Sequence, residues 1–317
     1  MHRIVLDVDT GVDDALAIAY AVRSSALDIL GITTSFGNVP VEYATRNTLH
    51  VLERLGATGI PVAMGEAAPL FHPSIKSYPV QFHGENGLGN LAFPDPGAKP
   101  VSTSAAAFMV DQVRRYPKQV TLICVGPLTN LAAAILQAPE ISSLVRQIII
   151  MGGAVGVPGN RRMHAEANVY SDPEAAQFVF QSGAPITLVG LDVTMQTELS
   201  LEDIQRWRDL DSDLTRFLAD MTSYYIGGYR EAYGDRTGCA LHDPLAVAVV
   251  IDPSLVEVQP MVLQVDLEGI HSYGRTIADL RPRCTARPNV NVCTGVDAKR
   301  FQEHFMKTLM KQLQHKE

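Results

Sequence analysis

Four carboxylates stand close together near the start of the chain, where a short apolar run gives way to a helix-like segment. They are Asp7, Asp9, Asp13 and Asp14. Like charges held this close raise the pKa of some members unless a cation or strong hydrogen-bond donors offset the repulsion. No Lys or Arg lies between Arg3 and Arg23, so a metal ion is the natural counter-charge. Oxygen ligands favour a hard ion, Ca²⁺ or Mg²⁺, over zinc or copper.

The local geometry expected of this segment allows the acids to converge. Side chains alternate along a strand, so Asp7 and Asp9 point to the same side. Gly11 permits a tight turn that brings the two aspartates of the first helical turn back toward Asp9. The structural alternative is capping, because aspartates at a helix start satisfy free N–H groups and favour the positive end of the helix dipole. Capping explains one or two aspartates, whereas four crowded ones favour a metal site.

Two Asp-Pro pairs stand at the start of later helix-like stretches. Asp before Pro is an ordinary helix start, with Asp as the N-cap and Pro in the first turn. We interpret Asp172, which precedes Pro173, as such a cap. By local pattern alone Asp243, which precedes Pro244, is either a cap or a site residue. His242 beside it is a residue type with an ordinary pKa of about 6.5, which suits a proton donor.

Polar residues further along could surround a small hydroxylated ligand. Asn160, Glu166 and Asn168 follow an expected strand that ends at Met151, and Asn38 follows the second expected strand. A cluster of amides with one carboxylate suits hydroxyl groups better than phosphate. The alternative is that these are ordinary exposed or turn-forming loop residues.

Aromatic residues lie in two further segments. Four tyrosines in a helix-like stretch offer rings for stacking on a base, with core packing as the alternative for each: Tyr224, Tyr225, Tyr229 and Tyr233. We select Tyr225 and Tyr229 as candidate substrate-binding residues. His83 lies in a Gly-rich loop, where a lone histidine is more often simply at the surface.

Apolar runs rich in β-branched residues alternate with helix-like stretches over about the first 190 residues. The runs are 4–8, 29–33, 60–63, 120–125, 148–151 and 186–189. This alternation is typical of βαβ units in a parallel sheet. It predicts an α/β fold with a Rossmann-like, doubly wound, mostly parallel sheet.

The pattern then changes to additional C-terminal helices and a few extra strands. Helices are expected at 201–210, 214–233, 244–251 and from 297, and strands at 256–267 and 290–296. No Pro/Gly/Ser-rich linker separates the two parts, so we expect residues 1–317 to form a single domain. Two long loops, 66–101 and 152–171, stand out because long loops in a compact domain are commonly functional or mobile.

Composition argues against several classes of protein. The formal net charge of −8 argues against a nucleic-acid binder, which needs clustered Lys and Arg. The four cysteines are far apart and form no CxxC pair, which argues against a zinc site or a disulfide framework. The first apolar run is too short for a signal peptide and is interrupted by acidic residues, and no run of about 18 apolar residues follows. We therefore expect a soluble cytoplasmic enzyme that binds no membrane.

The acidic segment DVDTGVDDALA at residues 7–17 resembles the N-terminal signature of the inosine-uridine-preferring nucleoside hydrolases. The resemblance continues in the family's order through SFGN (35–38), HGENGLG (83–89), VGPLTNLA (125–132), IMGG (150–153), AEANVYSDPEAA (165–176) and LHDP (241–244). A lone DxDxG is a weak signal, whereas six further patches in order are specific and span nearly the whole chain. The resemblance implies a Ca²⁺-dependent enzyme of nucleoside salvage or catabolism that hydrolyses ribonucleosides and forms a homodimer or homotetramer.

The resemblance also implies a role for individual residues. The metal ligands would be the side chains of Asp9, Asp14 and Asp243 and the main-chain carbonyl of Val125. The ribose hydroxyls would be bound by Asp13, Asn38, Asn160, Glu166 and Asn168. Further contacts with the nucleoside would come from His83, as a base-side residue on a flexible lid, and from Met151. His242 would protonate the leaving base.

The expected mechanism is attack of a metal-held water on C1′ of the ribose, with Asp9 as the base and no covalent sugar intermediate. Two alternatives remain. A haloacid-dehalogenase-type Mg²⁺-dependent phosphatase also carries DxDx near its N-terminus, but its downstream Ser/Thr, Lys and paired acids are not evident. A non-catalytic ribonucleoside-binding protein would typically lose the water-activating acids, all of which are present here.

Overall fold

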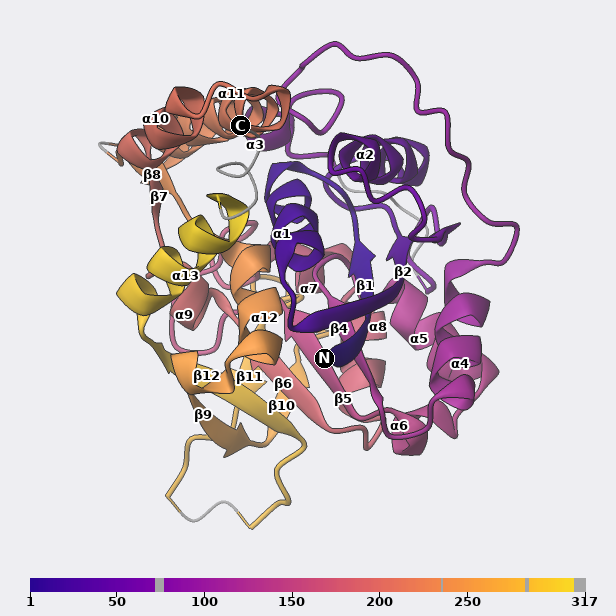
Figure 1. The fold of residues 1–317 in the computed structure, drawn as a ribbon. Coiled ribbons are helices and arrows are strands. Elements are labelled where there is room, and N and C mark those ends of the chain that lie inside the picture. Colours follow the sequence, from indigo (N-terminus) through magenta and orange to yellow (C-terminus); the bar gives the residue numbers. More distant parts are fainter. Residues whose placement is uncertain (72–76, 235, 283–284, 311–317) are drawn as a thin grey trace.

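The computed structural model describes residues 1–71, 77–234, 236–282 and 285–310, and an eight-stranded sheet forms its centre (Figure 1). In spatial order the strands are β3 (Val62–Met64), β2 (Leu27–Thr34), β1 (His2–Val8), β4 (Val120–Cys124), β5 (Gln147–Met151), β6 (Ile186–Val189), β12 (Val290–Val296) and β9 (Val256–Met261). All neighbouring strands are parallel except β12 and β9, which are antiparallel. The strand order reverses beside β1, as in doubly wound folds. The predicted fold class is confirmed.

Helices pack on both faces of this sheet (Figure 1). The first part of the chain forms α1 (Val12–Arg23), α2 (Val41–Arg54), α3 (Val80–His83), α4 (Ala105–Arg115), α5 (Thr129–Gln137), α6 (Ile141–Leu144), α7 (Ala167–Ser171), α8 (Pro173–Phe180) and α9 (Leu191–Thr194). The later part forms α10 (Leu201–Asp209), α11 (Asp213–Tyr233), α12 (His242–Ile251), the 3₁₀ helix η1 (Pro253–Leu255) and α13 (Ala298–Met310). Two small antiparallel sheets pair β7 (Leu199–Ser200) with β8 (Gly238–Cys239) and β10 (Leu263–Val265) with β11 (Thr276–Ala278).

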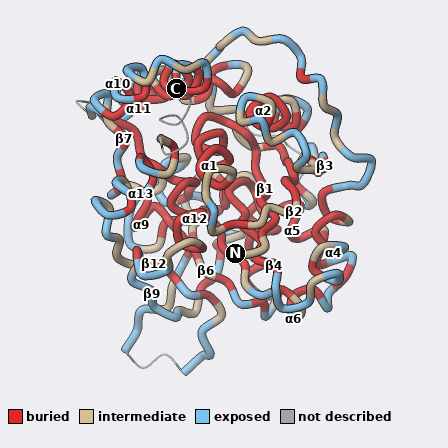
Figure 2. The backbone as a smooth tube through the Cα atoms, in the orientation of Figure 1, coloured by how far each residue is buried: buried red, intermediate tan, exposed pale blue. Residues whose placement is uncertain are grey.

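The central strands divide the apolar side chains between two buried clusters. Along β1, Leu6 and Val8 join the cluster that contains α1 and α12, whereas Val5 joins the cluster that contains α4 and α5. This division follows from the two-residue period of a strand. Figure 2 shows the buried backbone running through the sheet and the helices on it. The end of β1 is therefore fixed from both sides where the acidic segment begins.

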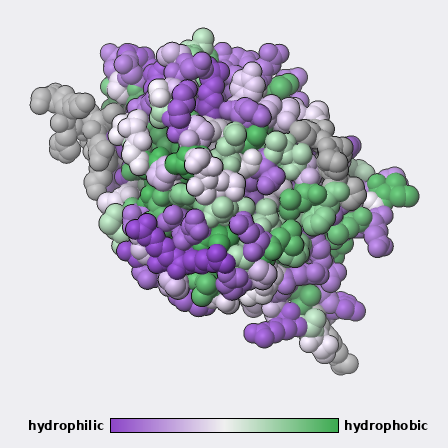
Figure 3. Space-filling model, turned by 90° about the vertical axis from the view of Figure 1, so that its right-hand side faces the viewer, coloured by the Kyte–Doolittle hydropathy of each residue, from purple (hydrophilic) through white to green (hydrophobic). Residues whose placement is uncertain are grey.

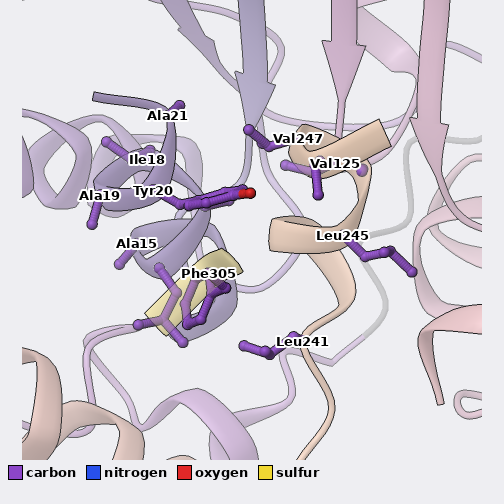
Figure 4. Close-up of a cluster of buried hydrophobic side chains, with 14 of the residues drawn as sticks. Ala15, Ile18, Ala19, Tyr20, Ala21, Val125, Leu241, Leu245, Val247 and Phe305 are labelled. Atoms are coloured by element: carbon purple, nitrogen blue, oxygen red, sulfur yellow. The ribbon is translucent and has the colours of Figure 1, made fainter. Parts of the chain in front are cut away.

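Helices α1 and α12 pack side by side, and α13 packs against both (Figure 4). Ala15 on α1 and Leu245 on α12 are fully buried. The hydroxyl of Tyr20 lies 2.6 Å from Nδ1 of His304, and its ring centroid lies 5.3 Å from that of Phe305. Because α1 and α12 each begin with acidic residues, this packing fixes the two acidic helix starts relative to each other.

The C-terminal strands and the long loops differ in detail from the prediction. The segment 256–267 forms two strands, because Met261 pairs with β12 whereas Leu263 pairs with β11. The loop 66–101 contains α3, and the loop 152–171 ends in α7. Helices of four or five residues carry too little periodicity to be found from a pattern of apolar residues.

The surface has no dominant chemical character on the face shown in Figure 3, where hydrophilic and hydrophobic side chains are interspersed. Strongly exposed large apolar side chains, such as those of Ile270 and Leu280, are few among the described residues. None of the described helices is both long enough and apolar enough to cross a membrane.

Candidate active site

A pocket opens at the carboxyl ends of β1, β2, β4 and β5, where open α/β sheets bind their ligands. The predicted site residues that line it are Asp9, Asp13, Asn38, His83, Val125, Met151, Asn160, Glu166, Asn168, Tyr225, Tyr229, His242 and Asp243. Asp14 lies behind this lining, where its carboxylate accepts a hydrogen bond from the side chain of Asn38. The fold thus brings together residues that are spread over most of the chain.

Hydrogen bonds to its own backbone fix the acidic turn after β1. Asp14 Oδ1 accepts from the N–H of Asp9 at 3.1 Å, and its Oδ2 accepts from the N–H of Gly11 at 2.9 Å. The turn after β2 supports this arrangement, because the N–H of Asn38 donates to Asp9 Oδ2 at 2.6 Å. Two neighbouring strand ends therefore orient Asp9 and Asp14 together.

Glycines allow the loops to approach these acids. Gly11 has φ −93°, which any residue can adopt, so its dihedral angle does not require glycine. A Cβ at Gly11 would lie 2.4 Å from Nδ1 of His83, and a Cβ at Gly37 would lie 1.9 Å from Oδ2 of Asp9. Close packing around the site, more than turn geometry, explains the glycine at position 11.

Three carboxylates converge beside the pocket, since oxygens of Asp13, Asp14 and Asp243 lie within 4.8 Å of one another. Asp243 is the second residue of α12 and not its N-cap. Burial raises its pKa well above the usual value, and the charges of Asp13, Asp14 and Asp9 raise it further. Burial and then the charge of Asp13 raise the pKa of Asp14 to about 7. Burial, followed by the charges of Asp14 and Asp13, also raises the pKa of Asp9.

The donor set fits a hard divalent cation. Asp9 Oδ1 is buried and has no hydrogen-bond partner among the described residues. Nδ1 of His83 lies 3.8 Å from Asp13 Oδ1, but this nitrogen accepts a hydrogen bond and burial lowers the pKa of the ring, so His83 does not supply a counter-charge. The carbonyl of Val125 lies in the same lining and accepts a hydrogen bond from Asn168 Nδ2 at 2.7 Å. A cation bound by such oxygens would offset the mutual repulsion of the acids.

The loop before α7 supplies a polar wall. Glu166 is the N-cap of α7, and its carboxylate accepts from three backbone N–H groups at 2.8 to 3.1 Å. Burial raises the pKa of Glu166, although these donors oppose the shift. The side chain of Asn168 donates to the carbonyls of Val125 and Met151. Asn160 is exposed and accepts from a backbone N–H in the first turn of α7.

Helix α11 supplies an aromatic wall opposite the start of α12. The hydroxyl of Tyr225 donates to Asp13 Oδ2 at 3.1 Å. The hydroxyl of Tyr229 lies 2.6 Å from His242 Nε2, and Nδ1 of the same ring lies 2.7 Å from the hydroxyl of Thr194. Burial lowers the pKa of His242 to about 4. The imidazole is therefore neutral at pH 7 and is held between two hydroxyl groups.

His83 is buried in the site and does not lie at the surface. Its Nδ1 accepts from the N–H of Val12 at 3.1 Å, so the loop that carries it is anchored to the start of α1. Its ring centroid lies 5.2 Å from that of Tyr225. Burial lowers the pKa of His83, although the charge of Asp13 opposes this shift.

Three of the four candidate tyrosines line the pocket. Tyr225 and Tyr229 are buried, and Tyr233 lies at the mouth with its side chain exposed. These three share one helix face because they are four residues apart. Tyr224 points elsewhere, since its hydroxyl donates to the carbonyl of Val80 at 3.1 Å.

Two residues that the sequence analysis did not single out contribute to the site. Phe82 lines the pocket, and its ring centroid lies 6.2 and 5.6 Å from those of the two buried tyrosines. Its position next to His83 in the sequence could have identified Phe82 as a site residue. Thr194 orients His242 from 48 residues earlier in the chain, and no local pattern connects the two.

The fold and the site define a doubly wound α/β protein with a buried acidic pocket at the carboxyl ends of its strands. Residues 4–303 match the sequence profile of the family described as inosine-uridine preferring nucleoside hydrolase, and the chain belongs to this family. The match favours a nucleoside hydrolase over the phosphatase alternative.

Individual relatives extend over nearly the whole chain. Uridine nucleosidase 1 of Arabidopsis thaliana is 40% identical over 280 residues, which cover 88% of this chain and 82% of that protein. The pyrimidine-specific ribonucleoside hydrolase RihA of Escherichia coli O8 is 37% identical over 298 residues, covering 94% and 95%. A solved purine-preferring ribonucleoside hydrolase from Gardnerella vaginalis has a TM-score of 0.94 at 42% identity, covering 98% of this chain and 99% of that one. These names differ in base preference, so similarity alone does not assign one here.

Proposed function

We propose that this enzyme uses a bound Ca²⁺ ion to hydrolyse the N-glycosidic bond of ribonucleosides, releasing ribose and the free base in nucleoside catabolism. The observation that carries the proposal is the convergence of three buried carboxylates beside the pocket. One side of this pocket is the polar wall before α7, which we call the amide-rich wall, and another is the aromatic wall of α11. The ligands we propose are Asp9, Asp14, Asp243 and the carbonyl of Val125. Bound there, Ca²⁺ would lower the pKa of a water molecule and neutralise the acids.

Asp9 is the proposed general base. Its Oδ2 is held by the N–H of Asn38, whereas its Oδ1 has no partner among the described residues and is free to take a proton from water. The water oxygen forms a bond to C1′ while the C1′–N bond breaks on the opposite side. The sugar therefore leaves with inverted configuration and without a covalent intermediate.

The ribose is proposed to lie against the amide-rich wall. Glu166, Asn168 and Asn160 offer acceptors and donors for its hydroxyl groups, together with Asp13 and Asn38. Most of these side chains are already fixed by backbone hydrogen bonds, so little ordering is needed when the sugar binds. The surrounding carboxylates also stabilise the positive charge that develops on the ring as the base leaves.

The leaving base departs with the bonding electron pair and needs a proton. His242 is neutral at pH 7 and presents its Nε2 to the hydroxyl of Tyr229 on the pocket wall. We assign the donation to this hydrogen-bonded pair, with Thr194 fixing the ring from the other side. His83, Tyr225 and Met151 complete the nucleoside contacts.

A panel of nucleosides tests the proposal. Free base released from uridine, cytidine, inosine, adenosine and guanosine is measured by chromatography, each beside its 2′-deoxy analogue. We expect kcat/KM for the deoxy analogue to be lower by about 100-fold or more, because a missing hydroxyl leaves buried polar groups unpaired. Equal values for the two sugars would overturn the hydroxyl-binding assignment. Binding without release of any base would favour a non-catalytic binding protein.

Two organisational features complete the proposal. One sheet runs through both parts of the chain, which supports a single catalytic domain over residues 1–317. Association into a homodimer or homotetramer is the state we propose for the enzyme, and the mass of the purified protein by light scattering tests it.

A further inference from the structure

The segment that brings His83 into the site continues as a loop, residues 84–91, which hydrogen bonds within the loop hold in shape. The side-chain oxygen of Asn86 accepts from the N–H of Leu88 and from the N–H of Asn90, both at 3.0 Å. These bonds shape the loop, but they do not place it relative to the acidic turn, residues 9–14. Other contacts must therefore fix the loop beside the acids.

Asn47 on α2 joins this loop to the acidic turn. Its Nδ2 donates to the carbonyl of Thr10 at 3.0 Å and to the carbonyl of Asn86 at 2.8 Å. An amide nitrogen carries two hydrogens, so one group satisfies an acceptor in each segment. The side chain of Asn47 is only 1% exposed and does not line the pocket. Asn47 can affect the site only through the two segments that it joins.

The backbone of the loop lies directly against this amide. A Cβ at Gly87 would lie 2.6 Å from Nδ2 of Asn47 and 3.1 Å from the carbonyl oxygen of Thr10, and Gly87 has φ +86°. Nearby, the imidazole of His83 accepts from the N–H of Val12 at 3.1 Å. The loop therefore meets the acidic turn at two points, through the amide of Asn47 and through the ring of His83.

The two joined segments differ in how much they depend on Asn47. The carboxylate of Asp14 accepts from two N–H groups of the acidic turn, which holds that turn internally. The hydroxyl of Thr10 also lies 2.6 Å from the hydroxyl of Thr48, a second link between the turn and α2. Loss of the Asn47 amide therefore leaves the acidic turn fixed, whereas the loop loses one of its two links to the turn.

We propose that Asn47 is a positioning residue for hydrolysis, because its amide docks the loop 84–91 on the acidic turn and so holds His83 where it contacts the nucleoside. The inference rests on the proposed function, which assigns that contact to His83. When the loop is docked for only a fraction of the time, the apparent affinity for the nucleoside falls by that fraction. Turnover of the bound nucleoside changes less, because binding selects the docked loop.

The test compares two variants with a matched control. Asn47→Ala removes the amide, and Asn47→Ser is the milder variant if the first does not fold. Asn289→Ala is the control, because Nδ2 of Asn289 also donates to two backbone carbonyls, those of Phe180 and Leu263, at 3.0 and 2.9 Å. None of the three control residues lines the pocket. Loss of a bridging amide is thus compared at the site and away from it.

Three quantities are measured for each protein: the amide hydrogen exchange of residues 84–91, kcat and KM for the preferred nucleoside, and the affinity for Ca²⁺. In Asn47→Ala the exchange should be faster by about 10- to 100-fold, the size expected for the loss of two ordinary hydrogen bonds. KM should rise about 10-fold or more, whereas kcat and the Kd for Ca²⁺ should stay within about threefold of wild type. Asn289→Ala should leave all three quantities at their wild-type values.

A double-mutant cycle tests whether Asn47 acts through His83. In a His83→Ala background, Asn47→Ala should change kcat/KM by no more than about twofold, because the residue that it positions is already gone. Equal effects of Asn47→Ala in the two backgrounds would show that the two residues act independently, which would contradict the inference.

Three further results would overturn it. The first is an unchanged KM together with unchanged hydrogen exchange of the loop. The second is a loss of Ca²⁺ affinity in parallel with kcat/KM, which would place the effect of Asn47 on the acidic turn. The third is the same rise in KM in Asn289→Ala, which would show a general loss of stability. Absence of turnover with every nucleoside would instead refute the proposed function, while hydrogen exchange would still decide whether Asn47 docks the loop.

Discussion

Two Asp-Pro pairs stand at the starts of α-helices in the described part of this enzyme, and one of the two aspartates caps its helix. Asp172 is the N-cap of α8, and its Oδ1 accepts from the N–H of Ala175 at 3.1 Å. Its Oδ2 accepts from the hydroxyl of Thr129 at 2.8 Å and from a backbone N–H. Asp243 lies inside the first turn of α12, whose N-cap is Leu241, and no side chain caps this helix.

The difference lies in what surrounds each carboxylate. Asp172 is fully buried and satisfied by donors, so its negative charge stabilises the fold. Asp243 is equally enclosed, but burial raises its pKa, and the charges of its neighbours Asp13, Asp14 and Asp9 raise it further. A buried carboxylate among acids is unfavourable without a cation, which marks a binding site. The same dipeptide therefore serves structure in one place and, in our proposal, chemistry in the other.

The largest effect should follow from removing the charge of Asp243. Asp243→Asn keeps the shape of the side chain but weakens the proposed metal site, so we expect kcat for the preferred nucleoside to fall by about 1000-fold or more. Asp172→Asn is the matched control, and its kcat should stay within about threefold of wild type when the protein is folded. If Asp243→Asn kept wild-type turnover with Ca²⁺ present, Asp243 could not be an essential ligand.

Substitutions at the two aspartates should rank in the opposite order when stability is measured in place of turnover. Asp172→Ala loses a helix cap and leaves the hydroxyl of Thr129 and a backbone N–H without their acceptor, which should lower the free energy of unfolding by about 2–4 kcal/mol. Asp243→Ala should leave the metal-free protein as stable as wild type or more so, because it relieves charge repulsion. Urea unfolding in excess EDTA measures both variants. A larger loss for Asp243→Ala than for Asp172→Ala would reverse our assignment of the two aspartates.

A smaller effect should appear in the pH dependence of the metal-free protein. The folded-state pKa values of Asp9, Asp14 and Asp243 are raised above their unfolded values, to about 7 for Asp14. The folded state therefore binds more protons at these groups, and the stability they contribute is lost as pH rises from about 4 through about 7. The buried histidines have lowered pKa values and act in the opposite direction.

The Asp243→Asn variant separates the contribution of the acids to the pH dependence of stability from that of the histidines. The difference in Tm between Asp243→Asn and wild type, both without metal, should grow in favour of the variant by about 2–4 °C between pH 5 and pH 8. Saturating Ca²⁺ should remove the advantage of the variant at high pH, because only wild type has the full ligand set. A difference that stayed constant across this range would show that Asp243 is not in a repulsive cluster.

The sequence predicted the central sheet well because its inner strands are apolar runs that are mostly buried. The run 186–189 coincides with β6, whereas the expected strand 60–63 is shifted to Val62–Met64. The prediction of 256–267 as one strand-like segment was wrong. The segment divides at residue 262 because its two halves pair with different strands, β12 and β11. Pairing of this kind is a tertiary property that local patterns do not encode.

The predicted site residues gather in one pocket, but the finer geometry could not be deduced. The acids, amides and tyrosines of the site were predicted from residue type, spacing and the family resemblance. The sequence did not show that Asp13 shares the three-carboxylate group with Asp14 and Asp243, because this depends on the packing of α1 against α12. Likewise the hydroxyl of Thr194 becomes a partner of His242 only when distant segments fold together.

The central claim is that Asp9, Asp14 and Asp243 hold one divalent cation that the reaction requires. Metal-free enzyme is titrated with Ca²⁺ in a calorimeter, and the turnover of the preferred nucleoside is measured on samples at the same points. Our account predicts one Ca²⁺ per chain, turnover that rises in proportion to the bound ion, and loss of both in Asp243→Asn. Full turnover in the metal-free enzyme, or a bound ion whose occupancy has no effect on turnover, would contradict it.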